Sequence, residues 1–341
     1  MPPPTSQYLC RPLAQPLHNA DLSPSTDARA FGEFTVDYVY IVIGLAGLFF
    51  GGEALVRGSV GVAKRLSISP LVIGLTVVGF GTSMPELLVS VQAAFRGAPD
   101  IAVGNIIGSN IANILLIAGI TALVWPIRSA GASLRRDTAV MVGAGLLLIP
   151  LFMTGEIARW AGLILVGGLA GYLLWTFLAS REDDADDDIA AAPALSFTAA
   201  ALWVGAGFVG LLLGAQFLVG GAVSLAQSFG VSEAFIGLTI VAVGTSLPEL
   251  ATSLIAALRR QSDLAIGNIL GSNIFNVLGI LGITAVISPI PVAPRFLAFD
   301  LPVMIAVSLA LTALLLLRPH IGRVTGAAFL IAYTLYIVSA Q

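Results

Sequence analysis

The residues that could bind a cation stand in a short motif, G-T-S-x-P-E, which occurs at 81–86 and again at 244–249. Each copy places two hydroxyl groups close to a carboxylate inside an apolar segment. The oxygen atoms come from Thr82, Ser83 and Glu86 in the first copy and from Thr245, Ser246 and Glu249 in the second. All of them are hard ligands, which suit Ca²⁺ and Na⁺ better than zinc or copper. The motif therefore predicts a site for a hard cation.

A proline within the motif should interrupt the helix that carries it. Pro85 and Pro248 lack a backbone donor, and each ring clashes with the carbonyl four residues earlier, which belongs to a glycine. An interrupted helix leaves backbone carbonyls free, and a cation that has lost its water can use them. We expect the carbonyls of Gly79 and Ala242 to serve in this way.

A second motif, G-N-I-x-G-S-N-I-x-N, follows at 104–113 and 267–276. Ser109 and Asn113 are four residues apart, as are Ser272 and Asn276, so each pair lies on one face of a helix. The glycines of the motif allow another helix to approach closely. We expect each pair to meet the interrupted helix beside it.

Both motifs belong to an internal repeat. Residues 70–127 align without a gap to residues 233–290, and more than half of the aligned positions are identical. Taken singly, Ser, Thr and Asn could merely join helices by hydrogen bonds, and Gly and Pro could merely kink them. A whole set duplicated in register, with one glutamate in each copy, favours an ion site where the two copies meet.

The composition indicates an all-α integral membrane protein. Hydrophobic residues make up 57% of the chain and charged residues only 10%, compared with about 25% charged residues in a soluble domain. The two glutamates therefore stand in runs where an ionised group costs several kcal/mol unless something compensates it. Apolar runs long enough to cross a bilayer predict ten helices. They lie at about 37–60, 69–95, 101–125, 137–155, 157–179, 197–226, 234–258, 264–287, 297–317 and 321–340.

The remaining segments divide the chain. We expect residues 1–36, which are rich in Pro and Ser and contain the single cysteine, to form a disordered tail. Residues 37–180 would form a first five-helix repeat and residues 197–341 a second. The acidic run within 181–196 is predicted to be a solvated cytoplasmic linker rather than a cation sensor, because blocks of like charge repel one another.

The positions of Lys and Arg predict the orientation, because cytoplasmic connections carry the excess of these residues. In a ten-helix arrangement most of them lie at one side, namely Arg57, Lys64, Arg65, Arg128, Arg135, Arg136, Arg181, Arg259, Arg260, Arg318 and Arg323. That side should be cytoplasmic, which places both termini outside a cell membrane. Because five helices separate equivalent points, the copies would be inverted-topology repeats, with broken helices at the midplane.

The first and sixth helices are rich in small residues. Glycines recur along both, including Gly51 and Gly214. We hypothesise that these two helices slide over a rigid core and open it alternately to each side. Glu53 is predicted to have a structural role by pairing with Arg57 one turn away, since its counterpart in the second copy is the uncharged Gln216.

The doubled segments GTSMPEL…GNIIGSNIAN and GTSLPEL…GNILGSNIFN resemble the two alpha repeats of the sodium/calcium exchanger family, within the calcium:cation antiporter superfamily. The resemblance covers nearly everything after residue 37. It implies the ten-helix inverted-repeat fold and a cluster of adjacent sites midway through the membrane, where Ca²⁺ and Na⁺ compete. By motif match the implied ligands are Glu86, Thr82, Ser83, Gly79, Ser109 and Asn113, with Glu249, Thr245, Ser246, Ala242, Ser272 and Asn276.

The resemblance also bears on the coupling ion. The proton-coupled branch of the superfamily typically has G-N-x-x-E in place of G-T-S-x-P-E, and some members, including potassium-dependent ones, carry Asp at the position of Asn276. The sequence therefore predicts a secondary active antiporter that exchanges Na⁺ for Ca²⁺ by alternating access and extrudes Ca²⁺. Coupling to H⁺ or K⁺ is the alternative.

A charge argument made without the resemblance agrees with this prediction. Two ionised glutamates give a charge of about −2, which one Ca²⁺ or about two Na⁺ would neutralise, whereas an empty site leaves two carboxylates repelling each other. Occupied states should therefore cross the membrane more easily than the empty one, as an exchanger requires.

Two other functional classes fit less well. A passive cation channel also uses oxygen ligands, but it gives no reason for two antiparallel copies of a broken helix. An intramembrane hydrolase needs a set such as H-E-x-x-H, and neither histidine lies in the core. We expect no enzyme activity, no cofactor and no nucleic-acid partner. The short connection between the halves leaves no room for the large regulatory domains of animal relatives and favours a prokaryotic-type exchanger. The resemblance favours a monomer as the transporting unit in the lipid bilayer, with Ca²⁺ and Na⁺ as its transported ions.

Overall fold

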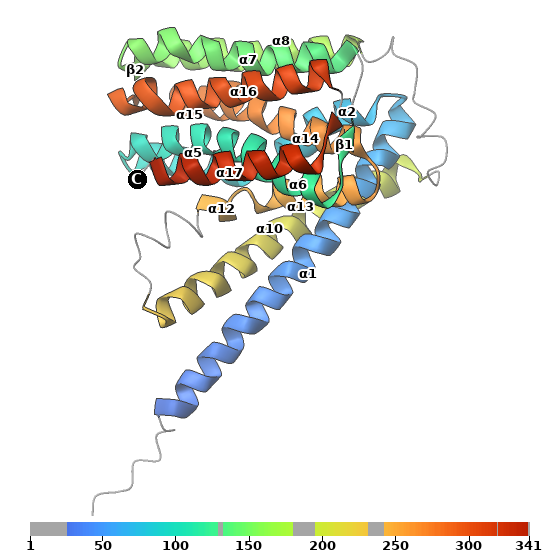
Figure 1. Ribbon diagram of the computed structural model, residues 1–341, viewed down its shortest axis with the longest axis vertical. Coiled ribbons are helices and arrows are strands. Elements are labelled where there is room, and N and C mark those ends of the chain that lie inside the picture. Colours follow the sequence, from blue (N-terminus) through green and yellow to red (C-terminus); the bar gives the residue numbers. More distant parts are fainter. Residues whose placement is uncertain (1–25, 129–131, 180–194, 231–241, 319, 340–341) are drawn as a thin grey trace, which may run out of the picture.

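A computed structural model describes residues 26–128, 132–179, 195–230, 242–318 and 320–339 of the chain. Helices dominate, and the strands among the described residues form only two-residue pairs (Figure 1). Seven of the described helices are long and apolar enough to cross a membrane, and an eighth span results if one bent pair counts as a single helix. The chain is therefore a multi-pass membrane protein. Most of the predicted acidic linker, and residues 1–25 of the predicted tail, lie outside the described residues.

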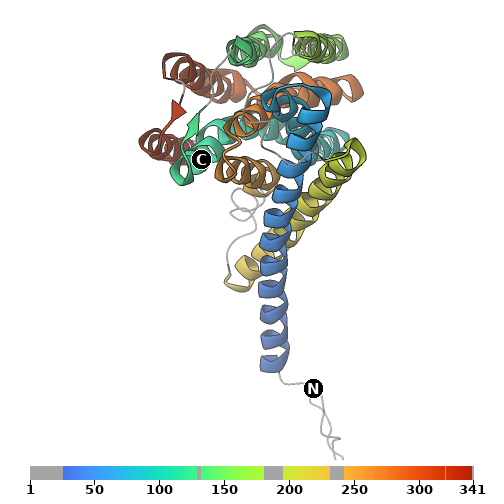
Figure 2. The same cartoon turned by 90° about the vertical axis from the view of Figure 1, so that its right-hand side faces the viewer.

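Two long helices, α1 (Thr26–Leu66) and α10 (Phe197–Ser228), run side by side along a diagonal of the molecule (Figure 1). Figure 2 shows the first part of α1 extending away from the bundle of the other helices. Because α1 begins at Thr26, the predicted disordered tail is wrong for residues 26–36. This stretch contains good helix formers such as Ala28 and Arg29, so the membrane helix can extend through it.

The contact between α1 and α10 depends on glycine. A Cβ atom added at Gly51 would lie 2.6 Å from the backbone nitrogen of Leu211, and one added at Gly214 would lie 2.6 Å from that of Leu48. Side chains cannot be inserted at such distances, so the two backbones pack directly against each other. The small-residue faces predicted for these two helices therefore meet.

The second motif lies at the centre of the bundle. It occupies α5 and η2 in the first copy and α14 and η4 in the second. The membrane spans that contain these elements, Pro99–Val124 and Ser262–Ile287, are 78% and 89% buried. By contrast, α8 and the η5–α16 span are each 33% buried and lie at the periphery. The bounds are α5 (Pro99–Ala112), η2 (Asn113–Ile117), α6 (Ala118–Val124), α7 (Ala132–Met153), α8 (Arg159–Ala179), α14 (Ser262–Ile274), η4 (Phe275–Leu281), α15 (Gly282–Ile287), η5 (Phe296–Asp300), α16 (Leu301–Leu317) and α17 (Arg323–Ser339).

The predicted helix break is confirmed in the first copy. The chain bends by 44° at Ser83, between the segments 70–82 and 84–95, and Pro85 stands just after the bend. In the second copy, a short helix ends at Gly244 and the next begins at Leu247, while residues 231–241 lie outside the described part. The elements are α2 (Pro70–Ile73), η1 (Gly74–Val78), α3 (Gly79–Thr82), α4 (Met84–Phe95), α12 (Ala242–Gly244) and α13 (Leu247–Leu258).

Short antiparallel strand pairs connect the two halves of the chain. Strand β1 (Ile127–Arg128) pairs with β4 (His320–Ile321), and β2 (Glu156–Ile157) pairs with β3 (Ile290–Pro291). In Figure 1, β1 and β2 lie at opposite ends of the bundle. Each end is therefore closed by a loop from both copies.

Replacing Gly214 with leucine should lower the melting temperature of the detergent-purified protein, because the new side chain would push α10 away from α1. Overpacking of this kind costs about 1–3 kcal/mol. Gly205→Leu is the matched control on the same helix, since a Cβ added at Gly205 has no neighbour within 4 Å. Equal melting temperatures for the two variants would contradict the close contact between the helices.

Candidate cation site

The two glutamates of the repeat meet through serines of the opposite copy. The Ser83 hydroxyl donates a hydrogen bond to Oε1 of Glu249 at 2.8 Å, and the Ser246 hydroxyl donates one to Oε1 of Glu86 at 3.2 Å. None of these four side chains is more than 3% exposed. The two copies thus exchange equivalent bonds, and their broken helices form a single site.

The second oxygen of each carboxylate remains free. Neither Oε2 of Glu86 nor Oε2 of Glu249 has a hydrogen-bond partner among the described residues, although both atoms are buried. The ion pairs found there involve Glu53, Asp137 and Asp300 instead. Burying an ionised carboxylate without a partner is costly, so a bound cation would supply the compensating charge.

Neutral oxygen atoms surround the carboxylates. Ser272 donates to the carbonyl of Gly79 at 3.4 Å, and a Cβ added at Gly79 would lie 2.9 Å from the Ser272 nitrogen, so α3 and α14 nearly touch. The Thr82 hydroxyl lies 3.2 Å from Oδ1 of Asn268, and Thr245 lies in the break between α12 and α13. The described residues contain no group of three or more His, Cys, Asp or Glu side chains that could hold a metal ion. A cation site here would therefore combine the two carboxylates with neutral oxygen ligands. Such a donor set fits a hard cation.

The two asparagines predicted as ligands, Asn113 and Asn276, are buried and lie in π-helical turns. Asn276 is 0% exposed and neither its nitrogen nor its oxygen has a hydrogen-bond partner in the described part of the chain. Asn113 donates to Oδ1 of Asn273 at 3.3 Å, but its own Oδ1 is likewise without a partner there. Asn113 begins η2 and Asn276 lies in η4, and π-helical turns often occur at functional sites. Their free amide oxygens are suitable ligands.

Four of the predicted ligands, namely Ser109, Asn113, Asn276 and Ala242, have no described contact with the glutamates. Ser109 lines a cavity of about 430 Å³ between α5, η5 and α17, which also reaches Asp100 and Asp300. Ala242 is the first described residue after the gap at 231–241 and begins α12. The ligand roles predicted for these residues, like those of the rest of the set, stay predictions.

The structure contains a second pair of buried carboxylates that was not predicted from the sequence. Asp137 and Asp300 are 0% and 4% exposed and occupy equivalent positions in the two copies. The Tyr172 hydroxyl donates to Asp137 at 3.1 Å, and the Tyr336 hydroxyl donates to Asp300 at 3.0 Å. Each carboxylate also pairs with an arginine, at 2.8 Å for Asp137 and 3.4 Å for Asp300. Because these acids have protein partners of their own, they differ from Glu86 and Glu249.

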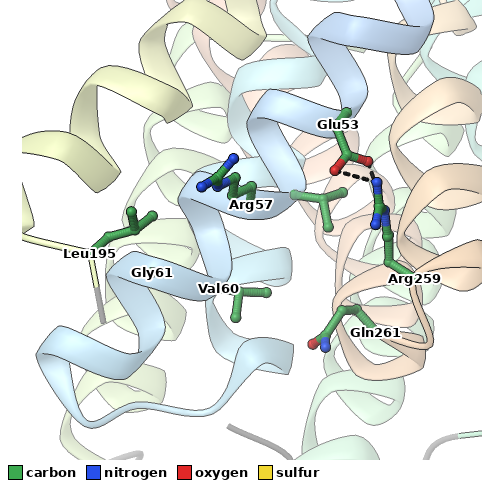
Figure 3. A pocket seen from close by; sticks show the side chains of 8 residues that line it. Glu53, Arg57, Val60, Gly61, Leu195, Arg259 and Gln261 are labelled. Atoms are coloured by element: carbon green, nitrogen blue, oxygen red, sulfur yellow. Dashed lines mark hydrogen bonds and ion pairs between the residues drawn. The ribbon is translucent and has the colours of Figure 1, made fainter. Parts of the chain in front are cut away.

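The predicted partner of Glu53 is wrong. Figure 3 shows Glu53 of α1 facing Arg259 at the end of α13, and the two side chains form an ion pair at 2.6 Å. Arg57 lies instead over the Trp203 ring, 4.9 Å from its centroid. The reason is tertiary packing, because α1 contacts α13 here and Arg259 can offer two nitrogens to the carboxylate.

Comparison with known proteins gives consistent results. The family model described as "Sodium/calcium exchanger protein" matches residues 36–178 and 199–340. The putative antiporter CaxA of Alkalimonas amylolytica is 40% identical over 308 residues, which cover 87% of this chain and 96% of that protein. The sodium/calcium exchanger MaX1 of Methanosarcina acetivorans is 31% identical over 343 residues, covering 89% and 98%.

Solved structures of the sodium-calcium exchanger NCX_Mj are also similar. For the protein soaked with zero Na⁺ and Ca²⁺, the TM-score is 0.79 at 32% sequence identity, and the match covers 90% of this chain and 99% of the other. For the protein soaked with 2.5 mM Na⁺ and 0.1 mM Ca²⁺, the TM-score is 0.78 at the same identity, covering 89% and 98%.

Glu86→Gln and Glu249→Gln should each weaken equilibrium binding of Ca²⁺ to the purified protein by roughly 10- to 100-fold. Each change removes a charged ligand, and hydrogen bonds or contacts to charged groups contribute about 1.5–3 kcal/mol. Asp137→Asn is the control, since Asp137 already has Arg136 and Tyr172 as partners. A Ca²⁺ affinity that falls as far in the control as in the glutamate variants would contradict this assignment.

Proposed function

The chain belongs to the sodium/calcium exchanger family, and we propose that it is a secondary active antiporter that exchanges Na⁺ for Ca²⁺ across the cell membrane and extrudes Ca²⁺. The observation that carries the proposal is the pair of buried carboxylates, Glu86 and Glu249, each bonded to a serine of the other copy through one oxygen and free at the other. The described residues offer these free oxygens no basic partner, so the charge balance is left to the transported ions.

Charge balance links the two ions to one another. One Ca²⁺ or about two Na⁺ would neutralise two ionised glutamates. If both ions use the same carboxylates, one must leave before the other binds, and this is the basis of exchange. Asn276 is neutral and buried, so it adds an oxygen ligand without adding a third negative charge. We take Na⁺ as the coupling ion, with H⁺ or K⁺ as the alternative.

For the fold, we propose ten transmembrane helices in two inverted five-helix repeats that work as a monomer. The reciprocal bonds between Ser83 and Glu249 and between Ser246 and Glu86 support a two-fold relation of the copies, as do the two strand pairs. At the end where β1 pairs with β4, Arg323 bonds the Leu123 carbonyl and Arg260 lies over Trp125. This basic end would face the cytoplasm, with both termini outside.

For the transport cycle, we propose that α1 and α10 slide together over the bundle and open the site to each side in turn. Their glycine contact supports movement as one unit. At the basic end, the ion pair between Glu53 and Arg259 joins α1 to α13. The equivalent positions at the other end are Gln216 and Arg96, which cannot form an ion pair. The ion pair would therefore favour closure on the cytoplasmic side.

The proposed exchange can be tested by ⁴⁵Ca²⁺ uptake into proteoliposomes loaded with Na⁺, with K⁺, or with a pH gradient. We expect uptake only when Na⁺ is present inside, because only Na⁺ leaving the vesicle would then drive Ca²⁺ inward. Loading with K⁺ and Na⁺ together tests a potassium requirement. Uptake driven by the pH gradient would replace Na⁺ with H⁺ as the coupling ion, and uptake indifferent to every counter-ion would indicate a channel.

Glu53→Gln should change the ratio between the half-saturating Ca²⁺ concentrations at the two membrane faces. The ion pair is partly exposed, at 30% and 59% of its side chains, so we expect a change of roughly 1.5- to 5-fold. The charge swap Glu53→Arg with Arg259→Glu should restore the original ratio, because the pair re-forms. A swap that behaves like the single variant would show that the ion pair does not bias the two states.

A further inference from the structure

We propose that Asn268 is a positioning residue of the cation site, which fixes the Thr82 hydroxyl of the first copy relative to Glu249 of the second. This inference rests on the proposed function, because it concerns the same site. Asn268 follows Gly267 at the start of the second motif, and the sequence predicts no ligand role for it.

The amide group of Asn268 has a partner on every side. Its nitrogen donates to the backbone carbonyl of Glu249 at 3.2 Å and to the Ser253 hydroxyl at 2.9 Å. Its oxygen accepts a hydrogen bond from the Thr82 hydroxyl at 3.2 Å. The side chain is 0% exposed, so water does not compete for these bonds. One residue of α14 thus connects the two broken helices, α3 and α13.

The bond from Thr82 matters because a hydroxyl has one proton and two lone pairs. A hydroxyl that binds a cation through a lone pair must direct its proton elsewhere. The carbonyls of Val78, 3.1 Å away, and Gly79, 3.5 Å away, can also accept that proton, but both belong to the same broken helix as Thr82. Of these three acceptors, only Asn268 also bonds the backbone of Glu249. It therefore sets the separation between ligands that come from different copies.

The first copy repeats the two bonds made by the amide nitrogen. The Asn105 nitrogen donates to the Glu86 carbonyl at 3.1 Å and to the Ser90 hydroxyl at 2.9 Å. The same bonds on equivalent residues indicate that an amide which holds the glutamate backbone is part of the site in both copies. An amide is also neutral, so it can order the ligands without changing the charge that the cation must balance.

A double-mutant cycle on the full-length protein tests this role. Thr82→Val removes the hydroxyl, Asn268→Ala removes the amide, and equilibrium binding of ⁴⁵Ca²⁺ is measured for each variant and for the pair. We expect each single change to weaken Ca²⁺ binding roughly three- to tenfold. Asn268 acts partly through Thr82. The loss of Ca²⁺ affinity in the double variant should therefore be at least threefold smaller than the product of the two single losses.

Asn105→Ala provides the matched control for the cycle. Its described bonds go to Glu86 and Ser90 of its own copy, so its effect should multiply with that of Thr82→Val. If the effects of Asn268→Ala and Thr82→Val also multiply, the proposed connection is overturned. Wild-type protein that does not bind Ca²⁺ at all would overturn the proposed function itself, which separates the two failures.

A milder variant covers the case in which Asn268→Ala fails to fold, as judged by size-exclusion chromatography. Ser253→Ala removes one acceptor of the Asn268 amide and leaves the amide itself in place. We expect it to weaken Ca²⁺ binding about two- to threefold in the wild-type background and to have a smaller effect in the Thr82→Val background. An equal loss of affinity in both backgrounds would overturn the proposal.

Discussion

Two buried carboxylates that have no basic partner among the described residues form the constraint on which the rest of this structure depends. An ionised glutamate at membrane depth is unfavourable unless a counter-charge is present. Glu86 and Glu249 each receive a serine hydroxyl from the opposite copy, but a hydroxyl carries no charge. In the proposed exchanger, the cation that balances them would thus be both the ligand of the site and the condition for keeping it ionised. This is why we propose that the site exchanges one cation for another more easily than it stays empty.

The backbone is arranged to bring these carboxylates together. Proline interrupts each motif helix, so Ser83 and Ser246 can turn toward the opposite copy. Glycines remove the side chains that would separate the elements, because a Cβ at Gly79 would come within 2.9 Å of α14. The same device joins α1 to α10 outside the site. Close backbone contact therefore serves two purposes, since it packs α3 against α14 at the site and joins α1 to α10 outside it.

Much of this arrangement could be predicted from the sequence, because the doubled motif identifies both the helix break and the residues near it. The partners of those residues could not be predicted. Local spacing paired Glu53 with Arg57, whereas tertiary packing pairs it with Arg259. Spacing also gave no means of knowing that Ser83 faces the carboxylate of the other copy, or that Asn268 joins Thr82 to Glu249. Contacts of this kind depend on how two distant segments pack, which neither hydrophobic pattern nor motif spacing determines.

The most direct test of a shared site is competition between Na⁺ and Ca²⁺ for the purified protein at equilibrium. ⁴⁵Ca²⁺ binding would be measured across a series of Na⁺ concentrations, with choline chloride keeping the ionic strength constant. If both ions balance Glu86 and Glu249, Na⁺ should displace Ca²⁺ completely, and with a Hill coefficient above 1, because about two Na⁺ replace one Ca²⁺. Ca²⁺ that stays bound at saturating Na⁺ would contradict the account, because the two ions would then occupy separate sites.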